Sequence, residues 1–206
     1  FKKVSFWHDI PYKTDNTYKM VIEIPQGTLK KLEMSKNETH NPILQDIKKN
    51  KLTNQEYLRY YKLVPTFNYG FIPQTWENNK KKIIADYVGD NDPIDILELS
   101  NKRYKIGDIV DVHILGGFCL IDEGEVDWKI LALDANSITK TEAKDWLNSN
   151  KERVKEIQKW FKIYKTFDGK GENIIYDNDR IYSQTEMYSI IEENHHEYLN
   201  LINNKI

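Results

Sequence analysis

The sequence predicts a mainly β domain with flanking helices, that is, an α+β fold. In the earlier part of the 206 residues, short runs of alternating apolar and polar side chains are separated by Gly and Pro. This pattern is typical of strands joined by tight turns. The later part changes to apolar spacings of three and four, which predict amphipathic helices. About six strands at short spacing favour a closed or nearly closed barrel.

Two strand pairs are the clearest predictions. Residues 18–25 and 28–35 alternate on either side of Gly27, which can adopt the positive φ of a hairpin turn. Residues 108–122 and 127–134 are apolar runs on either side of the sequence EGEV. We therefore expect two hairpins.

Three further segments of the earlier part are less regular. Residues 81–88 predict one more strand, which leads into an acidic run. Residues 67–77 are rich in aromatic side chains and are broken by Gly and Pro. Residues 41–62 are polar, and we expect them to be irregular.

Two principal α-helices follow the strands. In residues 151–165, apolar side chains recur at spacings of three and four, which predicts an amphipathic helix. Residues 183–206 open with Ser183 and Glu186, the two partners of a capping box. They continue with a helical apolar pattern.

Composition limits the classes of function. The chain has 39% hydrophobic and 30% charged residues and a formal net charge of -2, so it lacks the basic character of a nucleic-acid-binding protein. No apolar run approaches the roughly 20 residues needed to cross a bilayer. The single cysteine, Cys119, lies in an apolar run and fits a reducing compartment, so we expect a cytoplasmic protein. We also expect one domain over residues 1–206, with extensions trimmed from both ends.

An unusual acidic run lies in residues 88–99, with the sequence VGDNDPIDILEL. It places Asp90, Asp92 and Asp95 close together and between apolar residues. On a regular strand Asp90 and Asp92 share a face and Asp95 points away. Pro93 cannot donate to a central ladder, and a bend there would let Asp95 join the other two. Converging carboxylates repel one another unless a cation lies among them.

The second hairpin adds acids and a lysine. Its turn is expected to centre on Gly124 and Glu125. That alignment sets Asp122 opposite Asp127, and period-two alternation puts Lys129 on the same face as Asp127. The first hairpin is expected to show the same combination, with these residues on one face: Glu23 opposite Lys31, and Glu33.

Together the carboxylates and lysines predict a metal site that binds an anion. Ligation by oxygen alone suits hard cations, Mg²⁺ or Ca²⁺. Lysines within an acidic site indicate a third, anionic component, for which phosphate is the simplest candidate. Two less specific interpretations stay open, because Asp clusters are common on solvated turns and alternating Lys and Asp are common on exposed hairpin faces.

Five segments carry a resemblance to a known family. The sequences EIP…KLE, NYGFIPQTW, GDNDPID, DEGEVDWK and WFKIYK…DGKGEN occur in this order, and the chain closely resembles the soluble family I inorganic pyrophosphatases in their eukaryotic form. The resemblance covers nearly the whole chain. It implies a five-stranded OB-like closed barrel and a homodimer. It also implies hydrolysis of pyrophosphate to two orthophosphates, with several Mg²⁺ ions and no covalent intermediate.

The resemblance also implies a role for each charged position. Asp92 would be the general base, and Asp95 would bridge two metal ions. The metal ligands would be Asp90, Asp95, Asp122, Asp127 and, through water, Glu33. The catalytic group would be Asp92, Lys31, Tyr69 and Lys129, with phosphate contacts from Lys31, Tyr69, Tyr164 and Lys165, and with Glu23 supporting the ligands.

The segment before NYG departs from the family pattern. Thr53 stands where a eukaryotic member has a phosphate-binding arginine, and Pro65 stands where it has a tyrosine. Arg59 is the nearest substitute for the arginine, and we predict that it binds substrate. Either the loop is rearranged and Arg59, Tyr60 or Tyr61 takes over, or phosphate binding is weaker.

Two rival functions fit parts of the sequence. A non-catalytic OB module could bind an anionic ligand or a nucleic acid, although the predicted cleft is acidic rather than basic. The departures at Thr53 and Pro65 leave open a second rival, a degenerate pyrophosphatase that binds metal but is slow. With pyrophosphate as the expected substrate, we expect neither a nucleic acid nor a membrane as a partner.

Overall fold

The computed structural model describes residues 3–50 and 52–204. Within them, a nine-stranded sheet is accompanied by two small sheets, which pair β2 with β3 and β4 with β5. The strands are β1 (Tyr18–Ile24), β2 (Leu32–Met34), β3 (Ile43–Gln45), β4 (Ile47–Lys49), β5 (Glu56–Leu58), β6 (Asn68–Phe71), β7 (Lys82–Ile84), β8 (Tyr87–Gly89), β9 (Asp95–Glu98), β10 (Ile109–Asp122), β11 (Glu125–Asp134), β12 (Ile174–Ile175) and β13 (Tyr182–Ser183). The α-helices are α1 (Lys140–Ser149), α2 (Lys151–Ile163), α3 (Tyr176–Asp179) and α4 (Gln184–Ile202).

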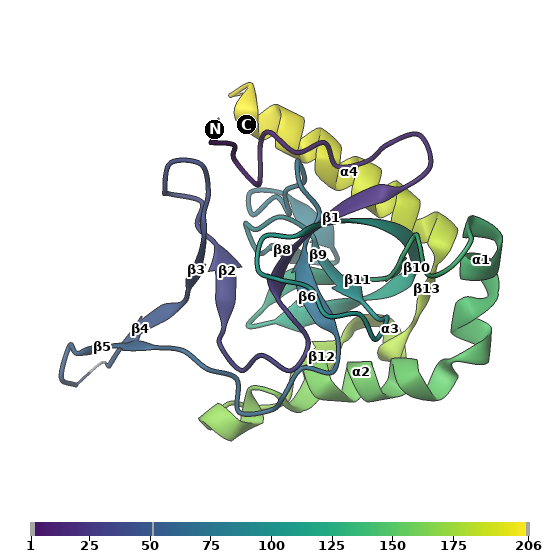
Figure 1. Ribbon diagram of the computed structural model, residues 1–206. Coiled ribbons are helices and arrows are strands. Elements are labelled where there is room, and N and C mark those ends of the chain that lie inside the picture. Colours follow the sequence, from purple (N-terminus) through teal and green to yellow (C-terminus); the bar gives the residue numbers. More distant parts are fainter. Residues whose placement is uncertain (1–2, 51, 205–206) are drawn as a thin grey trace.

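Five strands form a ring of backbone pairing (Figure 1). β1 pairs with β10 and β6, β6 pairs with β9, β9 pairs with β11, and β11 pairs with β10. Only the pairing of β9 with β11 in this ring is parallel. The mainly β class with flanking helices is therefore confirmed, and the ring has the strand number of the expected barrel.

The hairpin of β10 and β11 is confirmed, but its turn lies one residue earlier than predicted. Glu123 and Gly124 occupy the turn with φ values of 53° and 93°. Two residues with positive φ match the twist of the flanking strands. As a result Asp122 pairs with Glu125, so the prediction that it stands opposite Asp127 is wrong.

The first predicted hairpin does not form. Gly27 has the expected positive φ of 81°, but β1 already pairs with β10 and β6 along its two edges, so residues 28–35 cannot join it. Their strand β2 pairs with β3 instead, and the expected pairing of Glu23 with Lys31 is wrong. β1 and β2 are still linked, because Glu23 Oε1 accepts a hydrogen bond from the Met34 N–H at 2.6 Å.

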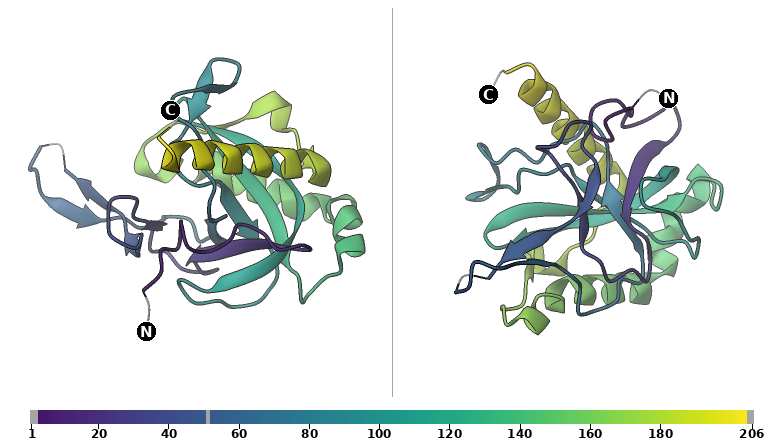
Figure 2. Two further views of the ribbon diagram at one scale, coloured as in Figure 1. Left: turned by 90° about the horizontal axis from the view of Figure 1, so that it is seen from above. Right: turned by 60° about the vertical axis from the view of Figure 1, so that its left-hand side comes forward.

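Two other segments differ from expectation. Residues 81–88 are not one strand but the hairpin of β7 and β8, reversed at Ala85, whose φ is 50°. Residues 41–62 are not irregular, because they contain β3, β4 and β5. β4 and β5 form an arm that projects from the body of the molecule (Figures 1 and 2). Each of these strands has three residues, which is too short for an alternating pattern to be detected.

The two principal helices are confirmed as α2 and α4. Ser183 and Glu186 form the predicted capping box of α4, which ends at Ile202; residues 205–206 of the expected helix lie outside the described residues. α1 was not predicted, although Thr139 and Glu142 form a capping box at its start. None of the helices in the described part of the chain combines the length and apolar character that a bilayer crossing requires.

The helices cover two sides of the barrel, each over its own apolar cluster (Figure 1). Met187 of α4 belongs to one cluster, and Phe161 of α2 belongs to the other. Side chains alternate along β11, so Trp128 packs in the first cluster and Leu131 in the second. Lys129, between them in the chain, is only 2% exposed. A charged side chain is thereby held in the barrel wall.

Candidate active site

Every residue predicted for the site lies at one cavity of about 710 Å³. The cavity opens between the barrel ring and the segment that carries β2 to β5. The acids at its lining are Glu23, Glu33, Asp46, Asp90, Asp92, Asp95, Asp122 and Asp127, and the cations and tyrosines are Lys31, Lys36, Arg59, Lys129, Lys165, Tyr61, Tyr69 and Tyr164. The fold therefore brings together residues that are far apart in the sequence.

The acidic run forms a loop from β8 to β9 rather than a continuous strand. Asn91 has a φ of 71°, and the Asp90 carboxylate accepts a hydrogen bond from the Asp92 N–H at 2.9 Å. Asp95 is the first residue of β9. The expected bend is present, because Asp90, Asp92 and Asp95 all line the cavity.

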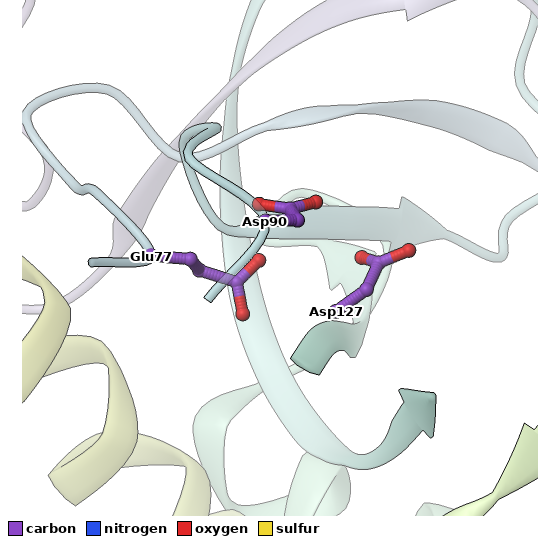
Figure 3. A group of neighbouring side chains, drawn as sticks. All are labelled: Glu77, Asp90 and Asp127. Atoms are coloured by element: carbon purple, nitrogen blue, oxygen red, sulfur yellow. The ribbon is translucent and has the colours of Figure 1, made fainter. Parts of the chain in front are cut away.

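Glu77 is a carboxylate that the sequence reasoning missed. Its Oε1 accepts a hydrogen bond from the Trp128 N–H at 3.0 Å. Its Oε2 has no hydrogen-bond partner, alone among the buried side-chain oxygens and nitrogens of the described residues. Oxygens of Glu77, Asp90 and Asp127 lie within 4.8 Å of one another, and Figure 3 shows the three carboxylates turned toward a common space. Gly89 permits this packing, since a Cβ there would lie 2.4 Å from the Glu77 carbonyl carbon.

Burial controls the protonation of this cluster. It raises the pKa of Glu77 and of Asp90 well above their ordinary values, and the neighbouring carboxylates raise both further. Burial also raises the pKa of Asp127 to about 8, although Lys129 opposes the shift. These carboxylates are thus unfavourable as a set of free anions, and a divalent cation among them would remove the repulsion. The donor set of carboxylate oxygens, with one buried oxygen unpaired, fits such an ion.

Lys129 holds the acids of β9 and β11 together. Asp95 and Lys129 are neighbours in the parallel register of these strands, and the Lys129 Nζ lies 2.5 Å from Asp95 Oδ2 and 2.5 Å from Asp127 Oδ1. Burial disfavours the ammonium, but Asp127 and Asp95 outweigh it and raise the pKa of Lys129 well above its ordinary value. The Lys129 Nζ also donates to the Tyr69 hydroxyl at 2.9 Å, which in turn donates to Asp95.

A second group of contacts forms where α2 ends. Tyr164 follows the last residue of α2, and its hydroxyl donates to Asp122 Oδ2 at 3.2 Å. The Lys165 ammonium forms an ion pair with the same carboxylate. The helix thus brings a cation and a hydroxyl to the end of β10.

The opposite wall of the cavity is a chain of ion pairs. Lys31 Nζ lies 2.6 Å from Glu33 Oε2 and 3.2 Å from Asp46 Oδ2, and Arg59 Nη1 lies 2.5 Å from the same Asp46 oxygen. Asp46 was not predicted. Asp46 thus lies between two cations, and with Glu33 this chain of ion pairs comprises two cations and two acids.

Lys36 links the two walls, and it too was not predicted. Its Nζ lies 2.6 Å from Asp92 Oδ1 and donates to the Asn91 carbonyl at 2.6 Å. No spacing in the sequence joins Lys36 to the acidic loop, so only the fold reveals the contact.

The two positions at which the sequence departs from the family pattern lie away from the cavity. Thr53 is exposed, and neither it nor Pro65 lines the cavity. The Pro65 carbonyl instead accepts a hydrogen bond from the Gly27 N–H at 3.0 Å. Arg59 and Tyr61 do line the cavity, so the loop supplies an arginine and a tyrosine from other positions.

Comparison with known proteins agrees with this geometry. The family model for inorganic pyrophosphatase matches residues 20–199. The inorganic pyrophosphatase of Candida glabrata is 39% identical over 99% of this chain and 73% of its own length. That of Drosophila melanogaster is also 39% identical, over 97% of this chain and 61% of its own length.

Solved structures give the same result. A truncated vacuolar soluble pyrophosphatase from Trypanosoma cruzi, described as a complex with PPi, has a TM-score of 0.88 and 35% identity, covering 98% of this chain and 80% of its own. The recombinant inorganic pyrophosphatase of T. brucei brucei has a TM-score of 0.90 and 31% identity, covering 99% and 63%.

We predict that Glu77→Gln raises the melting temperature of the metal-free protein. Because folding raises the pKa of Glu77 above its unfolded value of about 4.3, the wild type loses stability as pH rises above that value. Glutamine does not titrate and can donate to Asp90 or Asp127. Thermal melts in EDTA should therefore show a gain of several degrees at about pH 8 and a smaller gain at about pH 5, since 1 kcal/mol shifts the melting temperature by about 2–4 °C in a chain of this size.

The matched control is Glu152→Gln, whose side chain is 83% exposed and which should melt like the wild type at both pH values. A metal-free Glu77→Gln protein that melts below the wild type would contradict the prediction, because Glu77 would then be held by a partner.

Proposed function

The chain belongs to the inorganic pyrophosphatase family, and from this premise we propose that it hydrolyses pyrophosphate to two orthophosphates. The observation that carries the proposal is the division of charge across one cavity. One wall holds buried carboxylates, including an unpaired Glu77 oxygen, and the other holds two cations, Lys31 and Arg59, which form ion pairs with Glu33 and Asp46. A polyanion accompanied by divalent cations would satisfy both walls.

The family uses divalent metal ions, and the acidic cluster can hold one. We propose several Mg²⁺ ions, because carboxylate oxygens suit this ion. The proposed ligands are Asp90, Asp95, Asp122, Asp127, Glu77 and, through water, Glu33. When bound, these ions would neutralise substrate charge and lower the pKa of the attacking water.

The side chains of the chain divide the remaining work. Asp92 would accept the proton of the attacking water, since it lies beside the metal cluster but outside its buried part. Lys31, Arg59 and Lys165 would bind phosphate oxygens, with hydroxyl donors at Tyr69 and Tyr164. Each of these cations forms an ion pair with a carboxylate in the structure. On binding, a phosphate oxygen of the substrate would replace that carboxylate as the partner of the cation.

The other expectations remain proposals. We propose a single domain over residues 1–206, a homodimer and a cytoplasmic location. The homodimer rests on the resemblance and the location on the single cysteine, Cys119; relatives named for the chloroplast and the mitochondrion also match. The comparisons do not favour a non-catalytic OB module.

The direct test is phosphate release from pyrophosphate at millimolar Mg²⁺ and about pH 7.5. We expect turnover that EDTA abolishes. Asp127→Asn, purified in the same way, controls for a contaminating enzyme, because it should lose most of the activity. The absence of release above background would refute the proposal.

We predict that Asp92→Asn mainly lowers kcat. A general base typically contributes about 10²- to 10⁴-fold to rate, and the amide cannot accept the proton, so kcat should fall within that range while KM changes little. Steady-state kinetics at saturating Mg²⁺ measure both. Asp86→Asn, with a side chain 89% exposed, is the control. Near-full turnover of Asp92→Asn would exclude Asp92 as the base.

We predict that Arg59→Ala weakens the use of substrate. A hydrogen bond to a charged group contributes about 1.5–3 kcal/mol, so kcat/KM should fall roughly 10- to 150-fold. Arg180→Ala, which changes an arginine paired with Asp177 and Glu186, should leave kinetics unchanged. Values for Arg59→Ala within twofold of the wild type would exclude a phosphate contact.

A further inference from the structure

The segment after β5 presents its side chains alternately to the cavity and to solvent. The Arg59 N–H donates to the Asp46 carbonyl at 2.8 Å, and the Tyr61 N–H donates to the Leu29 carbonyl at 2.7 Å. Successive side chains of extended backbone point to opposite faces. Arg59 and Tyr61 accordingly line the cavity, whereas Tyr60 is 47% exposed and does not.

The Tyr61 ring is fixed by two aromatic side chains near the end of α2. It packs edge-on against Trp160, with ring centroids 5.3 Å apart, and against Tyr164, at 5.9 Å. Such contacts set the orientation of a ring without using its polar atom. The position of the hydroxyl is therefore determined by packing.

The Tyr61 hydroxyl has no hydrogen bond to any residue in the part of the chain that the structure describes. The other two tyrosines of the cavity differ, because Tyr69 donates to Asp95 and Tyr164 donates to Asp122. Burial raises the pKa of Tyr61 to about 12, while Lys31 and Lys129 act to lower it. The hydroxyl thus stays protonated at neutral pH, and it lies where two ammonium groups act on it.

We propose that the Tyr61 hydroxyl donates a hydrogen bond to a phosphate oxygen of the substrate, in a subsite shared with Lys31 and Arg59. This inference rests on the proposed function. The Tyr61 hydroxyl lies at the cavity without an acceptor among the described residues, and an anion between Lys31 and Arg59 would supply one. The alternative is that Tyr61 only fills space beside Trp160, which its ring would do without a hydroxyl.

The isosteric change Tyr61→Phe separates these two roles. We expect kcat/KM for pyrophosphate to fall about tenfold, and the Kd of inorganic phosphate, measured calorimetrically with Mg²⁺ present, to rise at least fivefold. The melting temperature of the metal-free variant should match the wild type, because no protein contact is lost. Tyr60→Phe, one residue away and outside the cavity, should match the wild type in all three measurements.

Two results would overturn the proposal. One is a Tyr61→Phe protein within twofold of the wild type in both kcat/KM and phosphate Kd. The other is a loss of activity accompanied by a fall of several degrees in melting temperature, which would make the hydroxyl structural. If the wild type does not hydrolyse pyrophosphate, the proposed function fails, and the phosphate Kd alone decides on Tyr61: a fivefold increase supports the contact, and an unchanged value overturns it.

Discussion

The site and the barrel both depend on one buried ammonium group, the Nζ of Lys129. Taking a charge out of water costs several kcal/mol, and the structure compensates with two carboxylates, Asp95 and Asp127, each 2.5 Å away. Asp95 begins β9 and Asp127 lies in β11, so the ammonium joins the two strands at the parallel pairing of the barrel ring. The same contacts that stabilise this pairing orient two of the proposed metal ligands.

The carboxylates consequently fall into two classes. Asp95 and Asp127 are paired with a cation inside the protein, and Asp95 also accepts from Tyr69. Glu77 and Asp90 have backbone donors only, at one oxygen each. Lys129 offsets part of the cost of burying the first pair, whereas no cation offsets the burial of Glu77 and Asp90, which opposes the fold when both groups are ionised. A site built for a ligand commonly carries such a conflict with stability, and here it is concentrated in two side chains.

Local patterns in the sequence predicted the contiguous elements of the fold. The hairpin of β10 and β11 was recognisable because both strands and their turn are adjacent in the chain. The pairing of β1 was not, because its two partners, β6 and β10, come from distant segments. An alternating pattern does not show which strand a segment pairs with, so residues 28–35 resembled the partner of β1, although both edges of β1 are paired with other strands.

The same distinction holds within the site. The acidic run and the alternating charges of β11 were detectable because they are dense in carboxylates and lysines. Glu77, Asp46 and Lys36 stand singly in their segments, and nothing local distinguishes them from surface residues. Only burial at 0% exposure marks Glu77, and burial depends on the tertiary fold. Gly89 gives an indirect local signal for Glu77. A glycine beside a cluster of acids is weak evidence that another backbone segment packs closely against it.

The two walls of the cavity differ in how firmly they are held. The acidic wall is formed largely by β9, β11 and the loop between β8 and β9, whose backbone belongs to the main sheet. The wall that holds Lys31 and Arg59 is carried by the segment of β2 to β5, which form only two-stranded sheets, and β4 and β5 extend away from the barrel (Figure 2). Short two-stranded pairs are only marginally stable alone, so their sequence is constrained less by packing than that of the ring. This difference explains how Thr53 and Pro65 can depart from the family pattern while the acids match it. A metal cluster needs several oxygens at fixed separations, whereas a phosphate accepts donors from many directions, so the proposed contacts of Arg59 and Tyr61 can come from a different place in the chain.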